Sequence, residues 1–233
     1  MKNNKKLTCF VIKKKYLMAS LFILLFILSS VGVFFIVSTT NASSYVSTIV
    51  IDAGHGGIDG GSIGYSGTIE KDINLEYSKT LKNMCSQFGF KVVMTRTNDS
   101  GLYSPFAVNK KKDDMKKRKQ IIEKAKPDIV ISIHMNSTKG NSSRGAQVFY
   151  NKENENSIRL ANSIQKQFQD KLIKPRKTSQ NGDYYIVNCT PYPSVIVECG
   201  FLSNKEEEKL LLTNDYKNNV CYSILCGIID YMA

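Results

Sequence analysis

The 233-residue sequence has only two histidines, His55 and His134, and it lacks several motifs that would place them in a familiar kind of site. It contains no GxxxxGK[ST] phosphate-binding loop and no HExxH metalloprotease helix. A dinucleotide-binding turn is also missing. Asp59 stands where the third glycine of GxGxxG would lie, and an acid suits a pyrophosphate poorly. These absences exclude the common nucleotide-binding motifs and one large class of zinc peptidases.

Acidic residues are absent from the first 44 positions, which contain six lysines. These lysines precede an apolar run from Tyr16 to Val37. A basic flank before roughly 20 apolar residues is typical of a membrane-targeting segment whose lysines stay in the cytoplasm. Thr40–Ala42 resembles a cleavage site, so residues 1–44 are predicted to be either a signal peptide or a retained signal anchor. In both cases we expect residues 45–233 outside the cytoplasm, membrane-anchored or secreted.

The cysteine count and the net charge say little about the function of the chain. Beyond residue 44 the chain has five cysteines, an odd number with no CxxC pair, which predicts reduced structural cysteines. The formal net charge is +12, of which +6 lies beyond residue 44, and the segment Lys110–Lys126 has a net charge equal to that excess. This segment is either a solvated helix face or a surface attracted to an anionic wall polymer or membrane. No nucleic-acid partner is expected of an exported chain without a nucleic-acid-binding motif.

Both histidines follow short apolar segments that are typical of buried strands. His55 follows residues 48–51 and lies in a glycine-rich turn, whereas His134 directly follows the apolar segment 129–133. Open α/β sheets bind ligands at the carboxyl ends of their strands. We therefore expect the two imidazoles to meet at one edge of a sheet.

Two glutamates occupy comparable positions. Glu70 lies directly before a predicted helix, and Glu198 follows the apolar strand predicted at 194–197. Two imidazoles and one carboxylate are a typical catalytic zinc set, so His55, Glu70 and His134 are predicted to bind one zinc ion. Glu198 is then available as the general base. The reaction that this set indicates is metal-assisted hydrolysis of an amide or ester.

Each of these residues also has an ordinary structural interpretation. A single histidine at a strand end is more often structural than a ligand. Glu70 could favour the positive end of a helix dipole, and Glu198 could be a buried acid paired with a cation. The metal-site prediction depends on the four residues occurring together.

The predicted elements alternate between strand and helix, which indicates a single α/β domain over residues 45–233 with a mixed six-stranded sheet flanked by helices. The predicted strands are 48–51, 91–95, 129–133, 146–150, 184–187 and 194–197. The predicted helices are 71–88, 113–126, 155–172, 205–212 and 216–231. No internal repeat or second domain is evident.

Several motifs follow one another in a fixed order over 49–233. They are Ile51–Gly57 (IDAGHGG), Glu70–Leu75 (EKDINL), Thr95–Asp99 (TRTND), Ser132–Asn136 (SIHMN), Gly145–Tyr150 (GAQVFY) and Val197–Asn204 (VECGFLSN). In this order they resemble the zinc-dependent N-acetylmuramoyl-L-alanine amidases of the amidase-3 type. The resemblance implies zinc binding by the two histidines and Glu70, and acid/base catalysis by Glu198. Arg96 and Asn136, which lie in matched motifs, are the candidate substrate-binding residues.

The family cleaves the amide between the lactyl group of N-acetylmuramic acid and L-alanine in peptidoglycan. A short catalytic domain without wall-binding repeats is most similar to the germination-specific amidases of spore-forming bacteria, which act on spore cortex on the route to muramic δ-lactam. Because no wall-binding module is present, we expect an accessory envelope protein as a partner. Two alternatives stay open: hydrolysis of a free peptide or small amide, and a catalytically silent wall-binding or scaffold protein of the same fold.

Overall fold

The structure, a computed structural model, describes residues 18, 22–28, 46–172, 176 and 179–233. The chain divides into two units, Met1–Tyr45 and Val46–Ala233. Of the predicted targeting segment, Met18 and residues 22–28 are described, as helix, and Thr40–Ala42 lies outside the described residues. None of the helices that the structure describes is long and apolar enough to cross a membrane. The targeting segment stays a prediction.

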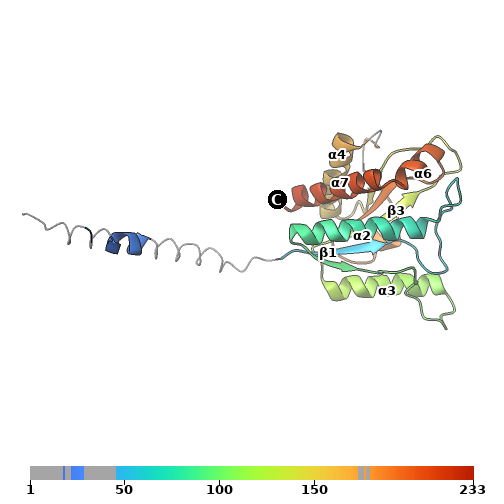
Figure 1. Ribbon diagram of the computed structural model, residues 1–233. Helices are drawn as coiled ribbons and strands as arrows, with labels where there is room; N and C mark the ends of the chain where they lie inside the picture. Colours follow the sequence, from blue (N-terminus) through green and yellow to red (C-terminus); the bar gives the residue numbers. More distant parts are fainter. Residues whose placement is uncertain (1–17, 19–21, 29–45, 173–175, 177–178) are drawn as a thin grey trace, which may run out of the picture. The chain divides into compact units, whose positions relative to one another are not determined.

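Six strands form one mixed sheet in the order β2-β1-β3-β6-β4-β5 (Figure 1). Strands β2, β1, β3 and β6 run parallel, β4 is antiparallel to β6, and β5 pairs parallel with β4. The central strands are runs of Ile and Val, as expected where both faces of a parallel sheet are covered. The strand bounds are β1 Thr48–Ala53, β2 Lys91–Met94, β3 Ile129–Asn136, β4 Gln147–Tyr150, β5 Gln180–Asn181 and β6 Ser194–Phe201.

Helices cover both faces of the sheet (Figure 1), which confirms the predicted fold class. One face carries α2, α4 and α7, whose apolar residues form the larger core; the other carries α3 and α5 over a smaller core. The helix bounds are α2 Glu70–Phe88, α3 Lys110–Ala125, α4 Glu155–Lys171, α5 Tyr185–Asn188, α6 Lys205–Leu211 and α7 Asn214–Met232. The five cysteines beyond residue 44 are all free, as predicted.

Side chains alternate along the central strands, and this alternation positions the polar residues. In β3, Ile131 and Ile133 face the larger core, whereas Val130 faces the smaller one. His134 therefore shares the α3 side of the sheet with Val130. Glu198 of β6 is the direct Cα partner of His134 and lies on the same side. The register of two neighbouring strands thus brings an imidazole and a carboxyl together.

One predicted strand is wrong. Residues 184–187 do not form a strand, because Tyr185–Asn188 is the single helical turn α5, and the sixth strand is the two-residue β5. A short apolar run cannot be assigned to strand or helix from periodicity alone. Here Ile186 and Val187 are buried through a helical turn against the smaller core, with Phe149 and Ile196.

Candidate active site

The three predicted metal ligands converge at the carboxyl ends of β1 and β3. His55 lies two residues after the end of β1, Glu70 is the first residue of α2, and His134 is on β3. Their donor atoms all lie within 4.8 Å of one another. Glu70 Oε1 is 3.2 Å from His55 Nε2 and 3.0 Å from His134 Nδ1. The two rings meet edge to face, with centroids 4.9 Å apart.

The buried carboxylate of Glu70 is fixed from several directions. The Ser62 backbone N–H donates to Oε2 at 2.8 Å, and the Asn74 amide and the Met135 backbone N–H donate to Oε1, each at 3.2 Å. Burial alone raises the pKa of Glu70, but the hydrogen bonds and charges of the two histidines outweigh it and hold this pKa well below its usual range. Glu70 is therefore an anion pointing at two imidazoles.

Two glycines give this cluster its space. A Cβ on Gly54 would lie 2.2 Å from His134 Nε2, so no side chain fits there. Gly61 has a φ of +68°, and a Cβ on it would lie 2.6 Å from Glu70 Oε2. The glycine-rich sequence is thus explained by close approach of the backbone to the ligand side chains.

His55 has a left-handed backbone, with φ of 60°, which is uncommon for a residue other than glycine. The buried Arg118 of α3 holds it there, since Nη2 donates to the His55 carbonyl at 2.6 Å. Its Nη1 donates to Asp52 Oδ1 at 2.6 Å and its Nε to Asp114 Oδ2 at 2.6 Å. The interpretation of Lys110–Lys126 as one solvated basic face is wrong for Arg118, which is 1% exposed.

Asp52 is the buried anion on which this network depends. Thr95 Oγ1 and Ser132 Oγ each donate to its carboxylate at 2.6 Å, in addition to Arg118. Burial raises the pKa of Asp52, but the opposing effect of Arg118 and the two hydroxyls is larger and brings this pKa down to about 2. The last residues of β1 are thereby fixed immediately before His55.

A second carboxylate lies behind the His55 ring. Asp59 Oδ1 is 3.0 Å from His55 Nδ1, on the opposite side of the ring from Glu70, and Lys111 Nζ lies 3.6 Å from Asp59 Oδ2. A carboxylate on the far nitrogen is typical of histidines that bind metals, because it fixes the tautomer and the orientation of the ring. Asp59 was not predicted as a site residue, although it lies four residues after His55.

Glu198 is the candidate general acid/base beside the three candidate metal ligands. Its Oε2 atom is buried and accepts no hydrogen bond from any residue that the structure describes. Burial raises the pKa of Glu198 to about 7; the charge of Glu70 adds to this effect, whereas His134 and His55 oppose it. A carboxyl group that exchanges its proton near neutral pH is suited to general acid/base catalysis.

The donor set fits a divalent metal ion. Two imidazoles and one ionised carboxylate lie within reach of a common point, and a further carboxyl oxygen nearby has no partner among the described side chains. Comparison with known proteins decides the family. The protein-family model described as N-acetylmuramoyl-L-alanine amidase matches residues 49–230. The chain belongs to this amidase family.

Individual relatives agree with this assignment. The germination-specific N-acetylmuramoyl-L-alanine amidase of Bacillus subtilis (strain 168) is 32% identical over 190 residues, 79% of each chain. The CwlD amidase of Clostridioides difficile, solved in complex with the GerS lipoprotein, is 36% identical, with a TM-score of 0.76 over 80% of this chain and 98% of that one. The catalytic domain of CwlV from Bacillus (Paenibacillus) polymyxa var. colistinus is 31% identical, with a TM-score of 0.71 over the same shares. The predicted family and enzyme class are confirmed.

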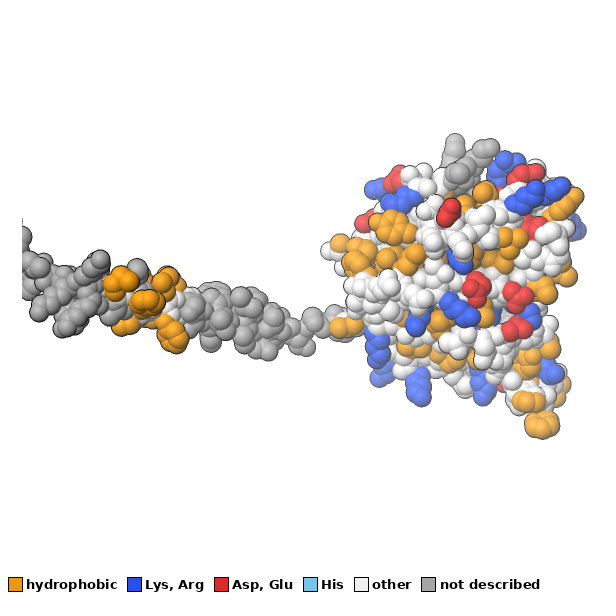
Figure 2. Space-filling model, in the orientation of Figure 1, with side chains coloured by type: hydrophobic (Ala, Val, Ile, Leu, Met, Phe, Trp, Pro, Cys, Tyr) orange, Lys and Arg blue, Asp and Glu red, His pale blue; other side chains and the backbone are white. Residues whose placement is uncertain are grey.

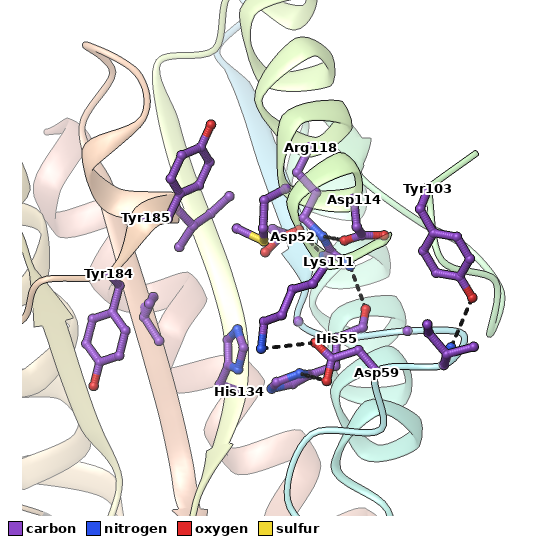
Figure 3. A pocket seen from close by; sticks show the side chains of 16 residues that line it. Asp52, His55, Asp59, Tyr103, Lys111, Asp114, Arg118, His134, Tyr184 and Tyr185 are labelled. Atoms are coloured by element: carbon purple, nitrogen blue, oxygen red, sulfur yellow. Dashed lines mark hydrogen bonds and ion pairs between the residues drawn. The ribbon is translucent and has the colours of Figure 1, made fainter. Parts of the chain in front are cut away.

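A cavity of about 430 Å³ opens beside the amidase histidines, between α3 and α5. Figure 3 shows Tyr184 and Tyr185 across this cavity from Tyr103, with His134 and His55 between them. None of the three tyrosines was predicted as a site residue, and two of them lie in the segment that was assigned to a strand. The other lining residues are Asp52, Gly54, Gly56, Ile58, Asp59, Lys111, Asp114, Met115, Arg118, Ile186 and Ile196.

The two predicted substrate-binding residues differ. Arg96 is 3% exposed, and its guanidinium donates to the backbone carbonyls of Ala53, Gly54, Lys71 and Asn98 at 2.8–3.0 Å. Its guanidinium thereby ties together the loops around the amidase site, and its role in substrate binding stays a prediction. Asn136 is half-buried at the end of β3, and its role in substrate binding stays a prediction.

Residues 60–64 (GGSIG) also match GxSxG, the pattern of the serine-hydrolase nucleophile turn. That turn requires a strand before the serine and a helix directly after it. Ser62 lies instead in the irregular segment between β1 and α2, and its backbone supports Glu70. The local structure therefore argues against a serine nucleophile in this amidase.

Proposed function

We propose that this amidase is zinc-dependent and cleaves the bond between N-acetylmuramic acid and L-alanine in spore-cortex peptidoglycan, on the route to muramic δ-lactam. The observation that carries this proposal is the cluster of His55, Glu70 and His134 beside Glu198, whose buried Oε2 atom has no hydrogen-bond partner among the described residues. A catalytically silent wall-binding protein would not need such a group.

Each residue of the site has a role that matches the chemistry of its side chain. His55, Glu70 and His134 would hold one zinc ion, which supplies a Lewis acid that polarises a carbonyl group and activates water. Glu198 takes the proton from the attacking water and delivers it to the nitrogen of the departing L-alanine. Its pKa of about 7 suits both transfers near neutral pH. Asp59 orients the His55 ring through Nδ1, and Arg118 holds the His55 backbone through its carbonyl group.

The cortex assignment is supported by similarity to the germination-specific amidase and to CwlD. The solved CwlD is in complex with the GerS lipoprotein, so we propose that this chain also uses an accessory envelope protein. We place its action outside the cytoplasm, in the developing spore envelope, with residues 1–44 as a cleaved signal or a membrane anchor.

The direct test uses residues 46–233, the compact unit that corresponds in extent to the separately solved catalytic domain of CwlV. The zinc-loaded protein is incubated with denuded peptidoglycan and the products are analysed by mass spectrometry. We expect peptide-free muramic acid and stem peptides with a new N-terminal alanine. Glu198→Gln should abolish both products, and the exposed Glu153→Gln should not. A zinc-loaded protein that binds peptidoglycan without releasing either product would refute the proposed amidase mechanism.

The cortex role needs a separate measurement in the organism that encodes the chain. Spores without the gene should lack muramic δ-lactam in their cortex, and the wild-type gene should restore it while the Glu198→Gln gene should not. A normal lactam content in deletion spores would refute the cortex assignment and leave the amidase activity untouched.

A further inference from the structure

The loop between β2 and α3 ends in an apolar tip. Phe106 is 94% exposed and Val108 is fully exposed. Large apolar side chains are normally buried, and two of them exposed side by side on one loop indicate a surface that is covered by something else.

The base of the tip is bonded to the first turn of α3. The Leu102 backbone N–H donates to Asp114 Oδ1 at 2.6 Å, and the Ser104 N–H donates to Asp113 Oδ2 at 2.7 Å. A turn follows, with the Ala107 N–H bonded to the Ser104 carbonyl at 3.0 Å. These bonds project Phe106 and Val108 outward.

Several lysines at the start of α3 add positive charge beside the tip, and Asp114 of the same helix is already paired with Arg118. Lys112, Lys116 and Lys117 are exposed and make no ion pair with any residue that the structure describes. Figure 2 shows basic side chains along the lower edge of the domain, over α3, and hydrophobic side chains at the adjoining lower right corner. An apolar tip and a row of lysines therefore lie next to each other.

We propose that residues 104–117 form a docking surface for an anionic lipid bilayer. Phe106 and Val108 enter the boundary between headgroups and acyl chains, and the lysines lie among the phosphate groups, the pattern of proteins that bind at a membrane surface. An anionic wall polymer would pair with the lysines but offers no apolar medium for the tip. Of these two anionic occupants, only the bilayer matches both halves of the surface.

The docking surface adjoins the amidase pocket. Tyr103 and Lys111 line the pocket and flank the tip, and the Lys110 ammonium lies 5.5 Å from the centre of the Tyr103 ring. Docking would set the pocket against the layer of peptidoglycan nearest the membrane.

The first test is sedimentation of residues 46–233 with vesicles at physiological salt. We expect binding to vesicles of equimolar phosphatidylglycerol and phosphatidylcholine, and little to pure phosphatidylcholine. Phe106→Ser with Val108→Ser should lower the affinity at least about tenfold through lost apolar burial. Lys116→Glu with Lys117→Glu should lower it by at least about fivefold for each lysine.

Matched controls test whether vesicle binding depends on this surface or on the overall charge and hydrophobicity of the domain. Ile63→Ser with Tyr65→Ser removes two exposed apolar residues from another loop, and Lys82→Glu with Lys166→Glu reverses two exposed lysines on other helices. Both controls should bind as the wild type does. Equal loss in the controls would overturn the proposal.

A second test uses the absence of tryptophan from the chain, which makes an introduced one the sole reporter. The fluorescence of Phe106→Trp should shift to the blue with anionic vesicles and be quenched by brominated lipid. Phe88→Trp, at an exposed position on α2, should show neither change.

Three results would overturn the proposal. They are vesicle binding that the Phe106 and Val108 substitutions do not weaken, displacement from vesicles by purified teichoic acid at equal phosphate concentration, and self-association that the same substitutions abolish. The second would assign the lysines to a wall polymer, and the third would assign the tip to another copy of this chain.

Discussion

Replacing Arg118 by methionine should destabilise the domain severely, although the residue lies in a helix that is otherwise rich in exposed lysines. The substitution keeps an unbranched apolar stem but leaves the buried carboxylate of Asp52 without its cation and the His55 carbonyl without its donor. Removing one partner of a buried ion pair costs about 3–5 kcal/mol. In a domain of this size that corresponds to a fall in Tm of roughly 6–20 °C.

The pH dependence tests the cause. In the wild type, the pKa of Asp52 in the folded state is about 2, below its ordinary value of 3.8. The stability that it contributes is present above about pH 4 and is lost as the pH falls toward 2. Without Arg118, burial raises this pKa, so protonation in acid relieves the variant. The difference in unfolding free energy between the two proteins should shrink as the pH falls.

The assay is urea unfolding of residues 46–233 at pH 7 and pH 4, with Lys116→Met on the same helix as the control, which should stay within about 0.5 kcal/mol of the wild type. Adding Asp52→Asn to Arg118→Met should restore part of the stability, because the unpaired charge is gone. An Arg118→Met variant within 1 kcal/mol of the wild type at pH 7, or a difference that does not shrink in acid, would refute this reasoning.

Three further outcomes are expected. Glu198→Gln should lower kcat at least about a hundredfold with unchanged zinc content, measured by peptidoglycan hydrolysis and metal analysis; a zinc-free variant would contradict a purely catalytic role. Gly54→Ala should abolish zinc binding because its Cβ would lie 2.2 Å from His134 Nε2, whereas Gly140→Ala, with open space around it, should bind normally. Asp59→Asn should weaken zinc affinity about 10- to 100-fold in competition with a chelator, and an unchanged affinity would contradict its role behind His55.

The strands that carry the site were predictable because their sequence leaves few alternatives. β1, β3 and β6 each contain a β-branched apolar run that is followed by a polar residue, so the positions of His134 and Glu198 follow from strand periodicity. The prediction failed where a local pattern had two solutions. Tyr184–Val187 is apolar enough for a strand or a helical turn, and contacts with Phe149 and Ile196 favoured the turn.

Arg118 was missed for a different reason. Within a run of lysines it adds one more positive charge, and composition cannot distinguish a buried cation from solvated ones. Its spacing held the missing signal. Asp114, Arg118 and Ile122 are four residues apart and share one face of α3, and all three are buried. Arg96 shows the same limit, because a motif position does not reveal whether a guanidinium binds substrate or backbone.

The pairing of His134 with Glu198 has a consequence for how the enzyme matures. The two residues are neighbours only through the β3–β6 register, and a slip of one residue would turn Glu198 to the opposite face of the sheet. His55, His134 and Glu198 are also far apart in sequence, so the site forms only after slow, long-range strand pairing. During refolding, helical circular dichroism should therefore return before activity does. The enzyme would stay inactive until β6 has paired with β3, which makes hydrolysis a direct reporter of completed folding.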